Sequence, residues 1–294
     1  MAITAADVMK LRKMTSAGMM DCKKALEEAE GDFDKAIGII REKGKLVAAK
    51  RADRETSEGA VKARIAGGKG ILVALGCETD FVSRNSDFQN LAEAIADVAI
   101  ANCPADIEAL KACKMADGYT VEEAVAAQTG KTGEKHTLAF YTLVEAPFVA
   151  EYIHKINGKL GALVGFNKEI PADLAKGIVM QVASMNPSYI SRNYMPQEVV
   201  DHEREVQVAL LEKDEKLASK PEKVKAGIIE GRISKSLQDM CLVDQEYFLD
   251  SDQKCGQYLK ANGAEVVKFV KYVVGEGIEK KDDNFAAEVA AMVK

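Results

Sequence analysis

The sequence predicts an α+β protein made of several folding units. Its 294 residues are too many for one small module, because a folding unit usually has about 100–200 residues. Two short apolar runs, 68–75 and 158–166, each follow a glycine-rich turn and lead into a helical pattern. Helical periodicity dominates both ends of the chain and the stretch 196–240. Strand–helix segments framed by helices indicate an α+β fold.

Residues 1–45 are expected to form a unit of three short helices. Thr4 and Asp7 form a capping box in which an acid replaces the usual Glu or Gln, and Asp32 caps the third helix. Gly31 is expected to end the second helix and Gly44 the third. The apolar residues on the inward faces are Val8, Leu11, Met14, Cys22, Leu26, Ala29, Phe33, Ile37 and Ile40.

A charged stretch without apolar periodicity, 46–58, follows as a linker or a solvated helix. The first core subdomain, 59–145, contains the run 68–75 as a strand and then a helix opened by Ser86, with Gln89 three residues on. One stripe of that helix is formed by Phe88, Leu91, Ile95 and Val98.

The second core subdomain, 146–195 together with 239–277, repeats this strand–helix order about 90 residues later. Its strand, 158–166, precedes a helix that follows Pro171. That helix has Leu174, Ile178, Val182 and Met185 on one face. Two such copies indicate a duplicated α+β core.

The segment 196–238 is polar and strongly helical with a break at Pro221, which predicts an antiparallel helical hairpin inserted in the second subdomain. Its apolar positions are Val199, Val206, Leu210 and Leu217 on one arm, and Val224, Ile228, Ile233 and Leu237 on the other. The C-terminal module, 278–294, contains an Ala-rich helix with Phe285, Val289 and Met292 on one side.

Composition excludes several functional classes. With 46 acidic against 40 basic residues the net charge is −6, which argues against a direct nucleic-acid partner. The six cysteines and three histidines show no metal-ligand spacing, so free thiols and neither metal nor cofactor are expected. No targeting segment or membrane span is visible, so we expect a cytoplasmic protein or the mature form of an organellar one.

No catalytic motif is found. The nearest candidate for a phosphate loop, Gly130-Lys131-Thr132, has Val125 where the first glycine of a P-loop would stand, and it follows an Ala-rich helix. It is therefore interpreted as a structural turn. No serine lies in a nucleophile elbow and no cysteine lies near a histidine in the sequence.

Two features point to protein binding. Phe81 follows Asp80 at the end of an apolar strand and lies outside the helix stripe that begins at Phe88. It is either a core phenylalanine beside a capping aspartate or an aromatic wedge on a surface loop. Met19 and Met20 are adjacent on a helix, so they point about 100° apart and cannot both face a small core. An exposed methionine suits adaptable protein-binding surfaces.

Three stretches of the chain resemble the bacterial-type elongation factor Ts family, in the expected order from end to end. They are LRKMTSAGMMDCKKAL at 11–26, CETDFV at 77–82, and VGEGIE at 274–279 with NFAAEVAAM at 284–292. The resemblance implies a ubiquitin-associated-like N-terminal domain, a core of two α+β subdomains with an inserted helical hairpin, and a C-terminal helix. It also implies nucleotide exchange on the GTPase elongation factor Tu, in its GDP-bound and nucleotide-free states, with no enzymatic reaction.

The resemblance also implies which residues contact the GTPase. In the family, the loop that here contains Thr79, Asp80, Phe81 and Val82 inserts between helices of the GTPase near its magnesium site. The N-terminal signature, here with Arg12, Met19, Met20 and Lys23, contacts the nucleotide domain, and so does the C-terminal helix with Phe285, Val289 and Met292. A further domain is contacted near Tyr152 and His154. Where relatives have I-G-E-N this chain has Thr129-Gly130-Lys131-Thr132, so only Gly130 is carried over; Ser16 replaces a family glycine.

Other functional classes are left open at this point. The chain could be a helical adaptor that binds ubiquitin-type partners through its N-terminal unit. It could also be an enzyme with a spatially assembled site, which predicts a deep polar pocket with perturbed carboxylates or thiols. The hairpin leaves a homodimer, or a heterotetramer with the GTPase, open as well.

Overall fold

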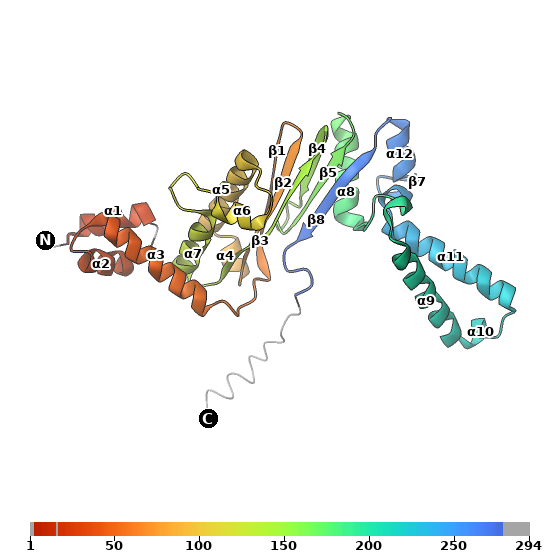
Figure 1. The fold of residues 1–294 in the computed structure, drawn as a ribbon, viewed down its shortest axis with the longest axis horizontal. Helices are drawn as coiled ribbons and strands as arrows, with labels where there is room; N and C mark the ends of the chain where they lie inside the picture. Colours follow the sequence, from red (N-terminus) through yellow and green to blue (C-terminus); the bar gives the residue numbers. More distant parts are fainter. Residues whose placement is uncertain (1–2, 16, 279–294) are drawn as a thin grey trace, which may run out of the picture.

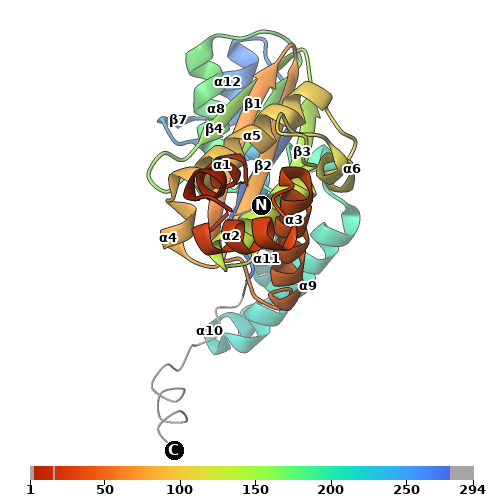
Figure 2. The same ribbon diagram turned by 90° about the vertical axis from the view of Figure 1, so that its left-hand side faces the viewer.

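The computed structural model describes residues 3–15 and 17–278 and shows a mixed fold of helices and antiparallel sheets, as expected for an α+β protein. Two three-stranded sheets pack face to face, and helices cover the outer face of each, so the core has four layers (Figure 1). The N-terminal helices extend from one side of the core and a helical hairpin extends from the other (Figure 1; Figure 2).

The N-terminal unit consists of three helices: α1 (Ala5–Thr15), α2 (Met19–Glu28) and α3 (Phe33–Lys50). The predicted capping box is confirmed, because the Thr4 N–H donates to the Asp7 carboxylate at 3.0 Å and the Asp7 N–H donates to the Thr4 hydroxyl at 3.3 Å. The small core consists of Val8, Leu11, Cys22, Ala25, Leu26, Ala29 and Ala36. Met14, expected inside, is exposed because it lies about 120° round the helix from Val8.

Helix α3 does not end at Gly44 as predicted but continues to Lys50, into the expected linker. It crosses α7 (Val121–Thr132) at two glycines, and a Cβ on Gly130 would come within 2.9 Å of the Gly44 Cα. Beside this crossing the Arg41 guanidinium lies 3.8 Å from the centre of the Tyr119 ring. Gly44 therefore permits close helix packing instead of ending the helix.

The first sheet has the antiparallel order β1 (Glu58–Ala66), β2 (Lys69–Cys77), β3 (His136–Glu145). Its outer face is covered by α5 (Ser86–Asn102), α6 (Ile107–Ala112) and α7. The predicted stripe of α5 is confirmed, with Phe88 and Ile95 fully buried. Asn85, and not Ser86, caps α5, since its side chain accepts the Asp87 N–H at 2.8 Å.

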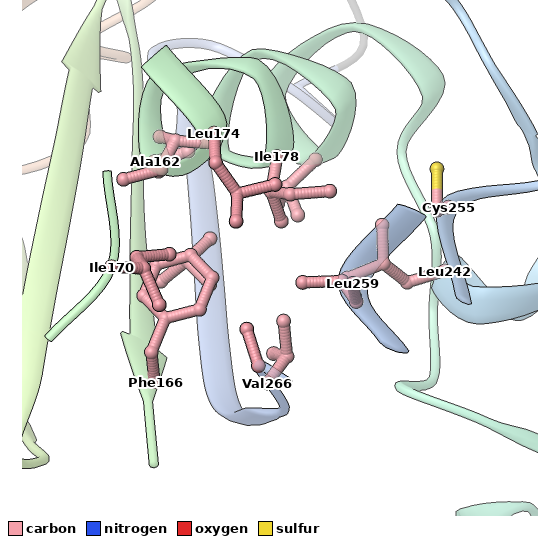
Figure 3. Packing of buried hydrophobic residues seen from close by; sticks show 14 of the residues in the cluster. Ala162, Phe166, Ile170, Leu174, Ile178, Leu242, Cys255, Leu259 and Val266 are labelled. Atoms are coloured by element: carbon pink, nitrogen blue, oxygen red, sulfur yellow. The ribbon is translucent and has the colours of Figure 1, made fainter. Parts of the chain in front are cut away.

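The second sheet has the antiparallel order β4 (Phe148–Ile153), β5 (Leu160–Phe166), β8 (Val266–Val273). Helices α8 (Ala172–Met185) and α12 (Cys255–Ala261) cover its outer face, and β6 (Glu246–Tyr247) pairs with β7 (Asp250–Lys254) beside them. Figure 3 shows Leu174 and Ile178 of α8 packed over Phe166 and Val266. Met185, predicted to face inward, is exposed in the last turn of α8.

The two central strands are buried on both faces, which explains their continuous apolar runs. In β2, Leu72 and Ala74 face the second sheet, whereas Ile71 and Val73 face the helices. Glycines allow the sheets to approach, because a Cβ on Gly161 would lie 2.6–2.8 Å from side chains of both sheets. In each sheet the order along the chain is hairpin, helix, third strand, and the weak repeat corresponds to the matching segments β2–α5 and β5–α8.

The predicted helical hairpin consists of α9 (Gln197–Lys213), the single turn α10 (Glu215–Ala218) and α11 (Glu222–Met240), and it projects from the core (Figure 1). Short 3₁₀ turns, η1 (Arg192–Tyr194) and η2 (Leu242–Asp244), lie at its base. Ile233 and Leu237 of α11 are buried as predicted. The predicted inward face of α9 was wrong by one residue, because Leu211 is buried while Leu210 is exposed.

The described chain ends at Ile278, shortly after β8. The predicted helix with Phe285, Val289 and Met292 therefore lies outside the described residues. No helix in the described part of the chain combines the length and the apolar character that a membrane span requires. All six cysteines are free thiols, as expected.

Candidate functional site

The segment after β2 forms a single helical turn, α4 (Asp80–Ser83), that carries Phe81 at the surface. Thr79 caps this turn, because its hydroxyl accepts the Val82 N–H at 3.4 Å. The Phe81 side chain is 85% exposed, which excludes the alternative of a core phenylalanine. Aromatic side chains dominate the energetics of protein interfaces, so a phenylalanine ring this exposed is a candidate contact for a partner.

The α4 turn is held by hydrogen bonds from several distant segments. The N–H and the hydroxyl of Thr79 donate to the Glu134 carboxylate at 3.1 and 2.7 Å. Arg51, just after α3, donates twice to the Glu78 carboxylate, and Asp80 forms an ion pair with Arg84 at 3.1 Å. The backbone beneath Phe81 is thus fixed from both flanks.

Sequence reasoning missed Glu134. This residue stands 55 positions after Thr79, in the loop between α7 and β3. The signal that could have found it is the pair Gly133-Glu134, which matches the G-E of the I-G-E-N pattern three residues after the position where that pattern was placed. Only the pairing of β3 with β2, in which His136 faces Cys77, brings the loop next to α4.

The turn between β4 and β5 lies at the same end of the sandwich as α4. The Val61 N–H of β1 donates to the Gly158 carbonyl at 2.7 Å, and Lys159 forms an ion pair with Glu58. Glu58 is in turn the register partner of Cys77, the last residue of β2. Segments about 75 residues apart in the sequence, the α4 turn and this turn, are thereby brought together.

Three further side chains mark this second turn. The Tyr152 hydroxyl and the His154 Nδ1 are 2.9 Å apart and form a hydrogen bond, so the two residues predicted to contact a partner act as one polar unit. Ile156, at the tip, is 88% exposed. Sequence reasoning did not single out Ile156, because one apolar residue in a turn carries no signal of its own.

The N-terminal signature also lies at the surface. Met19 and Met20 are 52% and 64% exposed, so both side chains avoid the small core. Arg12 is exposed, and Lys23 is exposed beside Glu27, with which it forms an ion pair at 3.7 Å.

A shallow hollow connects the N-terminal unit to the start of α5. It is lined by Met9, Arg12, Lys13, Asp87 and Lys131, and the last two form an ion pair. Asp87 lies six residues after Phe81. The Arg12 side of α1 therefore lies beside the start of α5, the helix that follows the α4 turn in the sequence.

Gly130, the remaining candidate, lies in the last turn of α7 against Gly44. The interpretation of Gly130-Lys131-Thr132 as a turn was wrong, because these residues are helical and the helix ends at Gly133, which has φ +76°. The described position gives Gly130 a packing role between two helices.

A polar hollow of about 860 Å³ lies between α4 and the loop that follows α3. Three of the five carboxylates that line it form ion pairs with basic neighbours: Glu78 with Arg51, Asp80 with Arg84, and Glu58 with Lys159. Burial raises the pKa of the nearby Cys77 thiol to about 12, so the thiol stays protonated. Within the described residues no group of three or more His, Cys, Asp or Glu side chains is placed to hold a metal ion.

An exposed aromatic ring on a capped turn, with the exposed Ile156 at the same end and ion pairs between them, has the features of a candidate protein-binding surface. The sequence model of the elongation factor TS family matches residues 78–276, more than half of the chain. The chain belongs to the elongation factor Ts family. Membership implies a nucleotide exchange factor for the GTPase elongation factor Tu in translation elongation, and not a catalyst of a chemical reaction.

Proposed function

We propose that this chain accelerates GDP release from elongation factor Tu by inserting Phe81 as a wedge near the Mg²⁺ and phosphate site of the GTPase. The observation that carries the proposal is the Phe81 ring, 85% exposed on a capped turn. Burying one phenylalanine side chain is worth about 1.5–3 kcal/mol. That energy corresponds to roughly a 10- to 150-fold change in an equilibrium constant.

Exchange by this route needs no bond-making. A factor that binds the nucleotide-free GTPase more tightly than the loaded one weakens nucleotide binding by the same ratio. Mg²⁺ requires a near-ideal octahedral geometry, so a small displacement of its ligands lowers the affinity for Mg²⁺ and for the phosphates. Asp80, paired with Arg84, positions the turn, while Thr79 and Val82 frame it.

Other contacts supply further affinity from other parts of the molecule. The nucleotide domain of the GTPase is contacted by four residues with exposed side chains: Arg12, Met19, Met20 and Lys23. A further domain of the GTPase is contacted by Tyr152 and His154. Contacts through Gly130, Phe285, Val289 and Met292 belong to the same proposal on the strength of the family resemblance alone.

The test uses stopped-flow release of mant-GDP from elongation factor Tu with and without this chain. We expect the chain to accelerate release, and the Phe81→Ala variant to slow the stimulated rate tenfold or more while remaining folded. Ile65→Ala is a matched control, since Ile65 is also an exposed apolar residue but lies on β1 near the opposite end of the sandwich. Equal release rates for wild type and Phe81→Ala would rule out the wedge.

The two other functional classes make different predictions. A ubiquitin-type adaptor would retain ubiquitin and not the GTPase in a pull-down with purified proteins. An enzyme would need an acid, base or nucleophile placed for reaction in the polar hollow beside Phe81, where three of the five lining carboxylates are paired with basic residues instead. Both the pairing and the family membership favour the exchange factor.

A further inference from the structure

Glu134 lies directly beneath the turn that carries Phe81. Its half-buried carboxylate accepts two hydrogen bonds from one residue, the N–H of Thr79 at 3.1 Å and the Thr79 hydroxyl at 2.7 Å. We propose that Glu134 is a positioning residue for exchange, which fixes the direction of the Phe81 ring through Thr79 without touching the GTPase. This inference rests on the proposed function of Phe81.

The hydroxyl of Thr79 explains why one carboxylate controls the turn. Because the hydroxyl donates its proton to Glu134, its lone pairs are oriented toward the Val82 N–H, which it caps. A helix of four residues cannot persist by its own backbone hydrogen bonds, since forming the first turn is unfavourable. The turn is also held at its far end, where Gln89 donates to the Ser83 carbonyl at 2.6 Å, but the orientation of its N-terminal cap is set by Glu134.

Glu134 itself rests on a fixed base. Its N–H donates to the Thr132 hydroxyl at 3.2 Å at the end of α7. The next residue, Lys135, donates its N–H to Glu78 at 2.6 Å and its Nζ to the carbonyls of Ala52 and Arg54, each at 2.7 Å. The loop thus joins the wedge turn to the segment that leads from the N-terminal unit, so the carboxylate is held in place before any partner arrives.

The experiment measures mant-GDP release from elongation factor Tu over a range of concentrations of this chain. We expect Glu134→Ala to lower the maximal stimulated rate about fivefold, the effect of losing one or two hydrogen bonds. Glu134→Gln keeps one carbonyl oxygen for the Thr79 hydroxyl but places an NH₂ donor toward the Thr79 N–H. Its maximal rate should therefore lie between those of the wild type and Glu134→Ala. Glu93→Ala is the matched control, because the Glu93 carboxylate also makes two polar contacts, here to Lys62 and Arg64, but in the middle of α5 and away from the α4 turn.

A double-mutant cycle separates this inference from the proposed function. If Glu134 acts through Phe81, adding Glu134→Ala to Phe81→Ala should cause no further loss of rate. A wild-type maximal rate for Glu134→Ala, or additive losses in the double variant, would overturn the inference while leaving the wedge intact. A wild-type rate for Phe81→Ala would instead refute the wedge itself. Faster amide exchange at Thr79 and Val82 in Glu134→Ala, with an unchanged melting temperature relative to Glu93→Ala, would support a positioning role.

Discussion

At the scale of single residues, the site depends on side chains whose neighbours are distant in sequence. Phe81 could be singled out from the sequence because it stands outside the helix stripe of α5. The hydrogen bonds from Thr79 to Glu134 could not be predicted, because they exist only after β3 has paired with β2. Both Met19 and Met20 are exposed. Helix geometry alone requires only that at least one of them lies outside the core.

His136 gives a prediction for the dependence of stability on pH. Its ring is buried beside Phe88, and burial lowers its pKa below the ordinary value. The hydrogen bond to the Glu134 backbone carbonyl and the carboxylates of Glu134 and Glu78 act in the opposite direction. The unfolded chain therefore binds a proton at a higher pH than the folded chain does. The free energy of unfolding should fall as the pH drops through about 6.5.

Urea unfolding at pH 7.5 and 5.5 checks this prediction. We expect the free energy of unfolding to fall more for the wild type than for His136→Gln over this interval, because the variant has no ring to protonate. Cys77, the register partner of His136, stays neutral throughout this range, since burial raises its pKa. Equal losses in the two proteins would show that His136 does not contribute.

At the scale of elements, the sequence predicted helices better than their ends and facing. Gly44 resembled a helix end because a C-capping glycine and a close-packing glycine look alike in one sequence. Strand β1 was not expected, because Lys62 and Arg64 interrupt its apolar run; both reach Glu93 on α5. In α9 the buried position is Leu211 and not Leu210, a choice that depends on where α11 lies.

The crossing of α3 and α7 gives the prediction at this scale. A Cβ on Gly130 would come within 2.9 Å of the Gly44 backbone, so Gly130→Ala should destabilise the protein by about 1–3 kcal/mol. Gly227→Ala in α11 is the control, because no atom lies within 4 Å of its added Cβ, and there a gain of about 0.5–1 kcal/mol is expected. Chemical unfolding of the three proteins measures both effects, and a neutral Gly130→Ala would contradict the tight crossing.

At the scale of the whole molecule, the sandwich places the α4 turn and the β4–β5 turn at one end. This arrangement was not predictable from the sequence, since it follows from the stacking of two sheets whose facing residues, such as Leu72 and Leu163, only the fold identifies. When several separate contacts lie at one end of the molecule, some can supply binding affinity while one, the Phe81 wedge, acts on the exchange rate. Affinity and exchange rate should then respond to different residues.

Ile156 tests that separation. It is 88% exposed near Tyr152 and His154, so Ile156→Ser should raise the concentration of this chain needed for half-maximal GDP release several-fold, and the maximal rate should stay close to wild type. Leu249→Ser is the control, because Leu249 is also exposed but lies beside β7 on the outer layer of the second sheet. Equal effects of the two variants would argue against a contact at the β4–β5 turn.

The central claim is that Phe81 acts on the rate of GDP release and not only on binding. The most direct measurement is the plateau of the mant-GDP release rate at saturating concentrations of wild type and Phe81→Ala. The wedge predicts a plateau at least tenfold lower for Phe81→Ala. A plateau equal to that of wild type, reached only at higher concentration, would mean that Phe81 is an anchor for binding and would contradict the account.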